Sequence, residues 1–273
     1  MSLTANTNIA SIAASRAVYE TRSDLTTAME RLSSGKRINS SSDDAAGQTV
    51  VSRMKAQITS LNQAVRNVND GLSLLNTYDG AADEIEDILI RMRELATLAQ
   101  NETYTDADRT NANYEVTALL SEITRIASKT AWNGTLDVAS AGGQYSFQVG
   151  FAAGDVAAFS FDKLDTTTLG VAGKSVTSID NASAAASAAD KGLSNLNVAR
   201  ATAGAAINRL EHTVSNLMNV IQRTEEARSR IEDADFATES AAMARANVLM
   251  QAGTAMLAQA NQSPQYILTL LRG

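Results

Sequence analysis

Apolar residues along most of this chain recur at alternating intervals of three and four, the spacing of an α-helix that buries one face. The longest run covers residues 58–99, and it slips by one extra three-residue step at Tyr78. A slip of this kind resembles the stammers that change the winding of a supercoil. Further runs fit residues 112–126 and 193–231. The pattern therefore predicts three long helices that share one apolar seam.

Both ends of the chain also carry helical apolar stripes. The stripe positions are Ile9, Ile12, Val18, Leu25 and Leu32 near the start, and Met243, Leu249, Met250, Gly253, Met256 and Leu257 near the end. Such a stripe is covered either by the rest of the fold or by another molecule. We interpret the two stripes as an assembly seam, and residues 33–44, rich in serine and glycine, as a linker between helical segments.

The character of the sequence changes over residues 131–189, where glycines flank short alternating runs. The pairs Phe147/Val149 and Phe159/Phe161 indicate β-strands joined by turns. The predicted fold is mainly all-α, an elongated helical rod or coiled-coil bundle built from both chain ends, with a small β-hairpin-like insertion. Its expected parts are a terminal helical pair of residues 1–44 and 230–273, a rod domain of 45–130 and 190–229, and the insertion of 131–189.

Composition supports long helices and argues against several classes of function. Only 4% of the 273 residues are aromatic, and alanine and aliphatic residues carry the apolar fraction, which suits helices packed side by side. A net charge of -7 makes nucleic acid an unexpected partner, because a phosphate backbone needs a basic surface. The absence of cysteine excludes disulfides and thiolate metal sites.

The start of the chain lacks a basic segment followed by an apolar run of 7–15 residues, and no stretch reaches ~18 uninterrupted apolar residues. We therefore expect neither a conventional signal peptide nor membrane insertion. By themselves these features indicate a cytoplasmic protein.

No residue cluster predicts catalysis or a cofactor. His212, the only histidine, lies off its helical stripe, and no serine or carboxylate arrangement points to it. The acidic group at 83–87 reads as a solvated helix face, with Arg91 and Arg93 nearby for pairing. The charged run at 228–235 has the same interpretation, although its arginines are available to bridge subunits. The stretch "SSSDDAAGQ" lacks the distant glutamate that closes a calcium loop.

Several stretches resemble the bacterial flagellins. They are "NIASIAASRAVYETRSDLTTAMERLSSGKRINSSSDDAAGQ", "RMRELATLAQ" and "ARSRIEDADFATESAAMARANVLMQAGTAMLAQANQSPQYILTLLRG", and more loosely "WNG" and "FQVG". The resemblance covers roughly the first 130 and the last 80 residues. Larger members carry outer domains in the middle, where this chain has only about 60 residues, so such modules are expected to be missing.

The resemblance implies a filament subunit of the flagellum, used for motility and exported through the hollow appendage by a type III apparatus. This overrides the cytoplasmic interpretation and places the protein outside the cell. The implied partners are further copies of the chain, an export chaperone on the carboxyl-terminal 40 residues, the filament cap and the hook–filament junction proteins. Two alternatives are a junction protein of the same family and a secreted hydrolase grafted onto flagellin ends, although about 60 residues leave little room for a catalytic domain.

In this family the two chain ends pair as helices that line the inner tube of the filament. Ordering a terminal segment of roughly 40 residues costs more conformational entropy than its own apolar burial returns. We therefore expect residues 1 to about 40 and about 235 to 273 to be largely disordered in the monomer and helical after assembly.

The stretch "RMRELATLAQ" is also similar to the segment that innate immune receptors of the Toll-like class recognise on monomeric flagellin, with Arg91, Leu95 and Glu115 at matching positions. An exposed arginine beside a leucine makes a suitable hot spot for an interface. The alternative is that Arg91 is merely solvated and Leu95 packs against its own rod.

Overall fold

The computed structural model of the chain describes residues 7–134 and 136–272. Within them the elements are α1 (Ile9–Ser34), α2 (Ala45–Ala99), α3 (Asp106–Lys129), β1 (Ala131–Trp132), β2 (Leu136–Asp137), β3 (Gly143–Gln148), β4 (Val156–Phe161), α4 (Ile179–Glu232) and α5 (Phe236–Arg272). The predicted mainly helical class with a small antiparallel β insertion is confirmed.

The chain divides into two compact units, one of residues 57–222 and one formed by the residues before and after that range. Helices α2 and α4 contribute residues to both units. The predicted domain ranges place their boundaries elsewhere and stay a prediction. Their positions 1–6, 135 and 273 lie outside the described residues.

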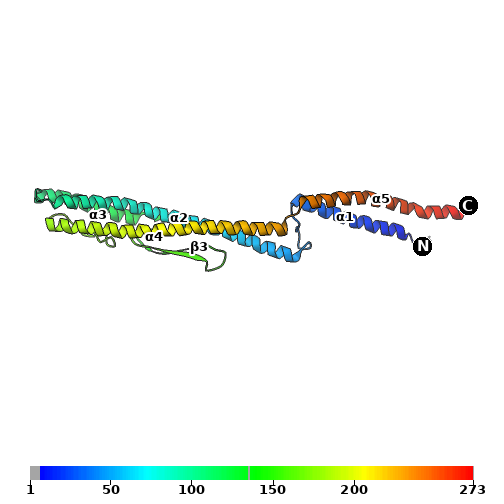
Figure 1. Cartoon of the computed structure of the whole chain (residues 1–273), viewed down its shortest axis with the longest axis horizontal. Helices are drawn as coiled ribbons and strands as arrows, with labels where there is room; N and C mark the ends of the chain where they lie inside the picture. Colours follow the sequence, from blue (N-terminus) through cyan, green and yellow to red (C-terminus); the bar gives the residue numbers. More distant parts are fainter. Residues whose placement is uncertain (1–6, 135, 273) are drawn as a thin grey trace. The chain divides into compact units, whose positions relative to one another are not determined.

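In the unit of residues 57–222, helices α2, α3 and α4 lie side by side (Figure 1) and share one apolar core. Its fully buried members include Val68, Leu75, Ile85, Leu89 and Met92 of α2, Val116 and Ile123 of α3, and Leu196, Ala203 and Leu210 of α4. The three predicted helices and their common seam are therefore confirmed. Helix α2 continues through the predicted slip at Tyr78, a buried side chain whose hydroxyl donates to the Asp162 carbonyl at 2.9 Å.

The β insertion packs on this helical core through aromatic side chains. Strands β3 and β4 form an antiparallel hairpin that pairs Gly143 with Phe161 at its open end. The Phe161 ring lies 5.3 Å from the ring of Tyr78. The predicted strands at Phe147 and at Phe159/Phe161 are confirmed, while Val149 lies one residue beyond β3. At Gly71 of α2 the hairpin comes so close that an added β-carbon would meet the Phe147 ring at 3.4 Å.

In the other unit, α1 and α5 from opposite ends of the chain pack antiparallel. The less exposed positions of each helix alternate by three and four, which is the spacing of an antiparallel helix pair. These positions are Ser11, Ala14, Val18, Thr21, Leu25, Ala28 and Leu32 of α1, and Met243, Ala246, Met250, Gly253, Leu257 and Ala260 of α5. Many of them are small, so the two helices approach closely.

The segment between α1 and α2 is a linker with defined structure. Gly35 adopts the left-handed conformation (φ 70°) that ends α1, and its carbonyl accepts a hydrogen bond from the Ala234 amide at 3.0 Å. Next to it, Lys36 forms a β-bridge with Asp233. Ile38 is buried, and an added β-carbon on Gly47 would lie 2.7 Å from its Cδ1 atom. The predicted linker therefore packs on the start of α2 and on the segment between α4 and α5.

Candidate assembly and recognition surfaces

The predicted assembly seam splits into two faces in the described chain. Seven of its residues lie on the contact face of the α1–α5 pair and are partly covered there, namely Val18, Leu25, Leu32, Met243, Met250, Gly253 and Leu257. The other four lie beside that face and are more than half exposed: Ile9 67%, Ile12 62%, Leu249 52% and Met256 64%. What reads in sequence as one continuous stripe is thus two adjacent columns, of which only one is covered within the chain.

The outward column of α5 belongs to an unusually uncharged segment. The sequence has no charged residue between Arg245 and Arg272. Val248 is 65% exposed beside the outward-facing Leu249 and Met256. Depletion of charge together with exposed aliphatic side chains is typical of the buried centre of a protein interface.

A groove of about 400 Å³ runs between α1 and α5 on the side of Arg31. Its walls include Asp24 and Arg31 of α1 and Glu239, Arg245 and Leu249 of α5. The Arg31 side chain donates to Glu239 at 3.0 Å, whereas its Nε atom is buried without a hydrogen-bond partner. The groove is lined by both charged and apolar side chains, as a contact surface often is.

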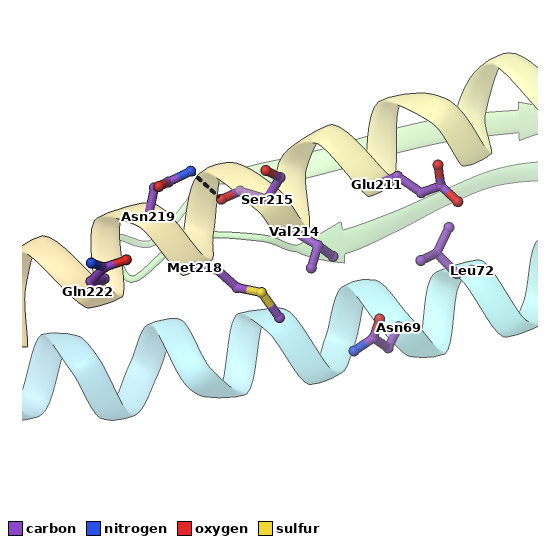
Figure 2. Close-up of a pocket in the computed structure, with 8 residues that line it drawn as sticks. All are labelled: Asn69, Leu72, Glu211, Val214, Ser215, Met218, Asn219 and Gln222. Carbon is purple, nitrogen blue, oxygen red and sulfur yellow. Dashed lines mark hydrogen bonds between the residues drawn. The ribbon is translucent and has the colours of Figure 1, made fainter.

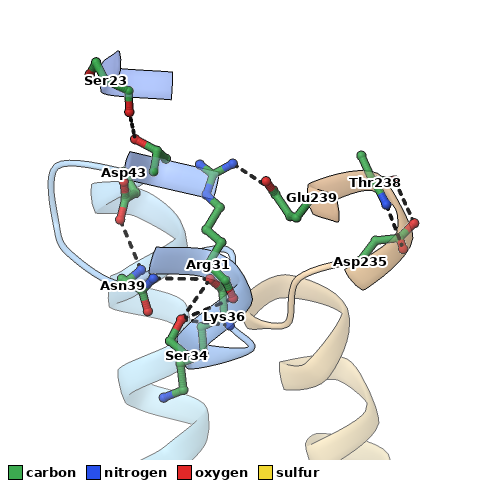
Figure 3. Close-up of polar contacts among 10 residues, drawn as sticks. Ser23, Arg31, Ser34, Lys36, Asn39, Asp43, Asp235, Thr238 and Glu239 are labelled. Carbon is green, nitrogen blue, oxygen red and sulfur yellow. Dashed lines mark hydrogen bonds and ion pairs between the residues drawn. The ribbon is translucent and has the colours of Figure 1, made fainter. Parts of the chain in front are cut away.

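Figure 3 shows the polar contacts where α1, the linker and α5 meet. Asp43 accepts hydrogen bonds from the backbone amides of Ser40 and Asn39, and these lower the pKa of its carboxyl group. Asp235 caps the start of α5, where the Thr238 hydroxyl and the amides of Ala237 and Thr238 lower its pKa in the same way. Both carboxylates thus hold turns rather than forming a binding site.

The charged run at 228–235 is not simply a solvated face. Glu232 is only 8% exposed and pairs with Lys36 at 2.6 Å and Arg228 at 3.5 Å. The Arg37 amide donates to the Glu232 carbonyl at 2.7 Å, and the Arg37 side chain donates to the Ile231 carbonyl at 2.8 Å. The solvated interpretation is therefore wrong for Glu232, because the linker from the front of the chain covers it.

The receptor-like residues are placed unequally. Arg91 on α2 and Glu115 on α3 meet at 2.8 Å, and Arg91 also donates to Glu94 at 2.8 Å. The hydrogen bonds from Glu115 and Glu94 raise the pKa of Arg91. Leu95 is only 5% exposed and belongs to the helical core. Leu95 thus packs against its own rod, as the alternative interpretation has it, while recognition by a receptor stays a prediction.

The acidic group on α2 pairs across helices instead of along its own helix. Arg200 of α4 lies 3.0 Å from Asp79 and 3.1 Å from Asp83, and it also contacts Glu86. The predicted pairing of Asp83 and Glu86 with Arg91 and Arg93 is therefore wrong. Spacing along one helix gives no signal for a partner more than a hundred residues away in sequence.

Arg109 is a buried cation with a structural role that the spacing of apolar residues does not reveal. It is 6% exposed and donates to the carbonyls of Ala99 at 2.9 Å and Asn101 at 3.1 Å. These contacts satisfy backbone groups at the end of α2. Arg93, by contrast, pairs with Asp190 of α4 at 2.5 Å on the surface.

An open groove of about 430 Å³ lies between α2 and α4 (Figure 2). Leu72, Val214 and Met218 provide its apolar wall, and Asn69 and Asn219 are among its polar members. Met218 is 56% exposed. The groove has the character of a contact surface. The described residues contain no group of three or more His, Cys, Asp or Glu side chains placed to hold a metal ion.

None of the helices, over the part of the chain that the structure describes, has the length and apolar character needed to cross a membrane.

Comparison with known proteins identifies the family. Residues 5–136 match the model of the bacterial flagellin N-terminal helical region, and residues 186–271 match that of the C-terminal helical region. The flagellin of Halalkalibacterium halodurans is 43% identical over 247 residues, which are 90% of this chain and 91% of that protein. The chain belongs to the bacterial flagellin family.

Solved structures agree with this assignment. The crystal structure of Bacillus cereus flagellin is similar with a TM-score of 0.50 and 34% identity, over 56% of this flagellin and 88% of that chain. A structure from Vibrio parahaemolyticus assigned as a flagellar hook-associated protein has a TM-score of 0.57 over 70% of this chain and 100% of that chain. Its 16% identity shows a shared fold alone.

Family membership confirms the predicted structural role. Flagellins polymerise into the flagellar filament, an extracellular appendage, so this flagellin is a filament subunit and not an enzyme.

Proposed function

We propose that this flagellin polymerises by burying the outward columns of α1 and α5 between neighbouring copies, and that the filament serves motility. The observation that carries the proposal is the exposure of Ile9, Ile12, Leu249 and Met256 beside a segment of α5 without charge. Full burial of such a side chain from water contributes about 1.5–3 kcal/mol, and these four still have roughly half to two-thirds of that to gain. The two columns are different surfaces, and contacts between unlike surfaces generate an open helix unless the rotation closes a ring.

We further propose that α1 and α5 become ordered only on assembly. The contact face supports this, because Ala28 and Ala246 are its most buried members, at 4% each, and an alanine buries little apolar area. The entropy of ordering the two helices is then not offset within one copy. Strong amide-exchange protection of residues 243–261 in the monomer would contradict the coupling of order to assembly.

The exposed apolar residues of the carboxyl-terminal segment also bear on how the chain is exported. An unfolded carboxyl-terminal segment with exposed apolar residues is an aggregation hazard before export, so a chaperone that covers it has a physical purpose. We propose export by the flagellar type III apparatus, with the cap and the junction proteins bounding the finished filament. A junction-protein role is the alternative. The 43% identity to a flagellin, against 16% to the hook-associated structure, favours the filament subunit.

We also propose that a receptor of the Toll-like class recognises the monomer. The exposed Arg91–Glu115 pair would form the contact, and Leu95 would support it from the core by fixing the surface of α2.

Electron microscopy of the purified chain after seeding with filament fragments tests the proposed assembly. Long filaments are expected from the natural sequence, and short capped stubs would favour the junction role. Ile12→Asp and Leu249→Asp each place a charge in an outward column and should abolish growth. Asn197→Asp adds a charge at an exposed position of α4 outside the described grooves and serves as the control that should still elongate. Normal filaments from both outward-face variants would refute the proposed interface.

A further inference from the structure

The only proline of the chain, Pro264, lies inside helix α5. In an α-helix each amide donates to the carbonyl four residues earlier, and proline has no amide hydrogen to donate. The carbonyl of Ala260 is therefore left without its helical partner. An unmet backbone carbonyl is costly where water is excluded, so such a group normally finds another donor.

The donor comes from the opposite end of the chain. The side-chain amide of Asn8 donates from Nδ2 to the Ala260 carbonyl at 2.7 Å, in a partly buried position. Asn8 is also the N-cap of α1, since its Oδ1 atom accepts the Ser11 amide at 3.0 Å. Beside it the Ser11 hydroxyl donates to Asn261 at 2.7 Å. The side-chain amide of Asn8 thus caps the start of α1 and also supplies the donor that the Ala260 carbonyl lacks within α5.

The rest of the contact face gives little preference for one alignment. Small residues repeat every seven positions on α5 at Ala246, Gly253 and Ala260, and on α1 at Ala14 and Thr21, with Ala28 seven positions further on. A slip of seven residues would again set small residues against small ones. A polar contact at one defined position is a known means of fixing the alignment of paired helices.

Different polar contacts join α1 to α5 at the two ends of the helix pair. Near the linker, Arg31 pairs with Glu239 at 3.0 Å and the Lys36–Asp233 bridge joins the two chain segments. At the far end the Asn8–Ala260 hydrogen bond is the corresponding contact. We propose that Asn8 and the carbonyl opened by Pro264 form a lock that sets the alignment of α1 on α5. Because Ile9 and Ile12 lie in the first turn after Asn8, the lock also fixes their positions along the helix pair relative to the exposed residues of α5.

A double-mutant cycle on filaments tests the lock, and this readout rests on the proposed function. Asn8→Asp keeps an acceptor that caps α1 but removes the donor to Ala260. Pro264→Ala restores an amide to the helix, so Ala260 no longer needs Asn8. We expect Asn8→Asp to raise the critical concentration for polymerisation about fivefold, equivalent to about 1 kcal/mol. In the Pro264→Ala background the same change should raise it less than twofold.

A second readout does not require polymerisation. A β-carbon on Gly253 would lie 4.0 Å from Cβ of Val18, within the range that a disulfide spans. Because the sequence has no cysteine, Val18→Cys with Gly253→Cys introduces a single possible pair. The equilibrium constant for its oxidation by glutathione scales with the fraction of chains in which the two helices align, so it reports the alignment even where that fraction is small before assembly.

This equilibrium constant should fall about fivefold with Asn8→Asp, and much less when Pro264→Ala is also present. If no filaments form while the disulfide cycle shows this coupling, the proposed function fails and the lock stands. If Asn8→Asp has the same effect with and without Pro264 in both cycles, the lock is overturned.

Discussion

Gly253 of α5 faces Val18 of α1 so closely that a β-carbon built on Gly253 would lie 2.8 Å from Val18 Cγ2. Real side chains do not approach to this distance, so the glycine sets the separation of the two helices. In a free helix alanine is more stable than glycine by about 1 kcal/mol. The close contact with Val18 therefore makes glycine more favourable than alanine at position 253.

We predict that Gly253→Ala destabilises the filament by about 1–3 kcal/mol through overpacking. Its effect should change sign when Val18→Ala removes the opposing methyl groups, because the helical preference for alanine then dominates. Thermal depolymerisation of filaments carrying each single change and the pair measures this. If Gly253→Ala lowers the midpoint equally in both backgrounds, the close approach does not set the spacing.

Glu232 is a buried carboxylate where the linker of residues 33–44 meets the segment between α4 and α5. It forms ion pairs with Lys36 and Arg228. Glu232→Ala should destabilise the contact between the linker and the segment joining α4 to α5 by about 2 kcal/mol, since Lys36 loses its carboxylate partner and Arg228 keeps only Glu225. Amide exchange in filaments should then rise at least tenfold at Arg37 and Ala234, whose amides bridge the two segments. The neighbouring exposed Asp233→Ala is the control and should change these rates little.

Tyr78 gives this flagellin a defined response to alkali. Burial raises the pKa of its hydroxyl, and the nearby carboxylates of Asp162 and Asp79 raise it further. An unfolded tyrosine ionises near pH 10, so the stability gained from a neutral Tyr78 is complete below that pH. It is lost progressively as the pH rises above 10 toward the folded value.

We therefore expect one of the six tyrosines to stay un-ionised in ultraviolet titration until the protein unfolds. Tyr78→Phe should lower the free energy of unfolding at pH 7 by about 1 kcal/mol, because the Asp162 carbonyl loses its donor. The free energy of unfolding of the same variant should decrease less steeply above pH 10 than that of the parent. If the variant still contains one tyrosine that ionises only on unfolding, Tyr78 is not the protected group.

The elements that sequence predicts well are those whose signal is local. The three-and-four spacing from 58 to 99 depends only on neighbours in sequence, and it identifies the buried face of α2. The start of α4 lies earlier than the stripe of large apolar residues, because its first turns bury alanines such as Ala182, Ala185 and Ala189. Small residues give a weak hydrophobic signal, although they pack as closely as large ones.

The candidate surfaces were harder to predict because they depend on contacts between distant segments. Spacing alone placed Leu249 and Met256 with Leu257, and only the paired helix shows which of them it covers. Leu95 carried a usable signal, since it lies three residues after the buried Met92 and four before the buried Ala99. The resemblance to a receptor segment assigns Leu95 to recognition, whereas its spacing supports the alternative that it packs against its own rod.

The burial of Leu95 changes how receptor recognition is best tested. Leu95→Ala would open a cavity costing about 2–5 kcal/mol, so a loss of signalling would reflect unfolding. Arg91 and Glu115 are exposed enough to be removed with little effect on the fold, since their ion pair contributes at most about 1 kcal/mol. We predict that Arg91→Ala with Glu115→Ala weakens signalling by the monomer through a Toll-like receptor at least tenfold.

Removal of the exposed pair formed by Arg125 and Glu122, on the same helix as Glu115, provides the matched control. Both double variants should unfold at nearly the same urea concentration as the parent. If the Arg91 and Glu115 variant keeps full signalling while folded, the solvated interpretation of Arg91 is correct. If both double variants lose signalling equally, the effect is one of general surface charge, because each variant removes one exposed arginine and one exposed glutamate.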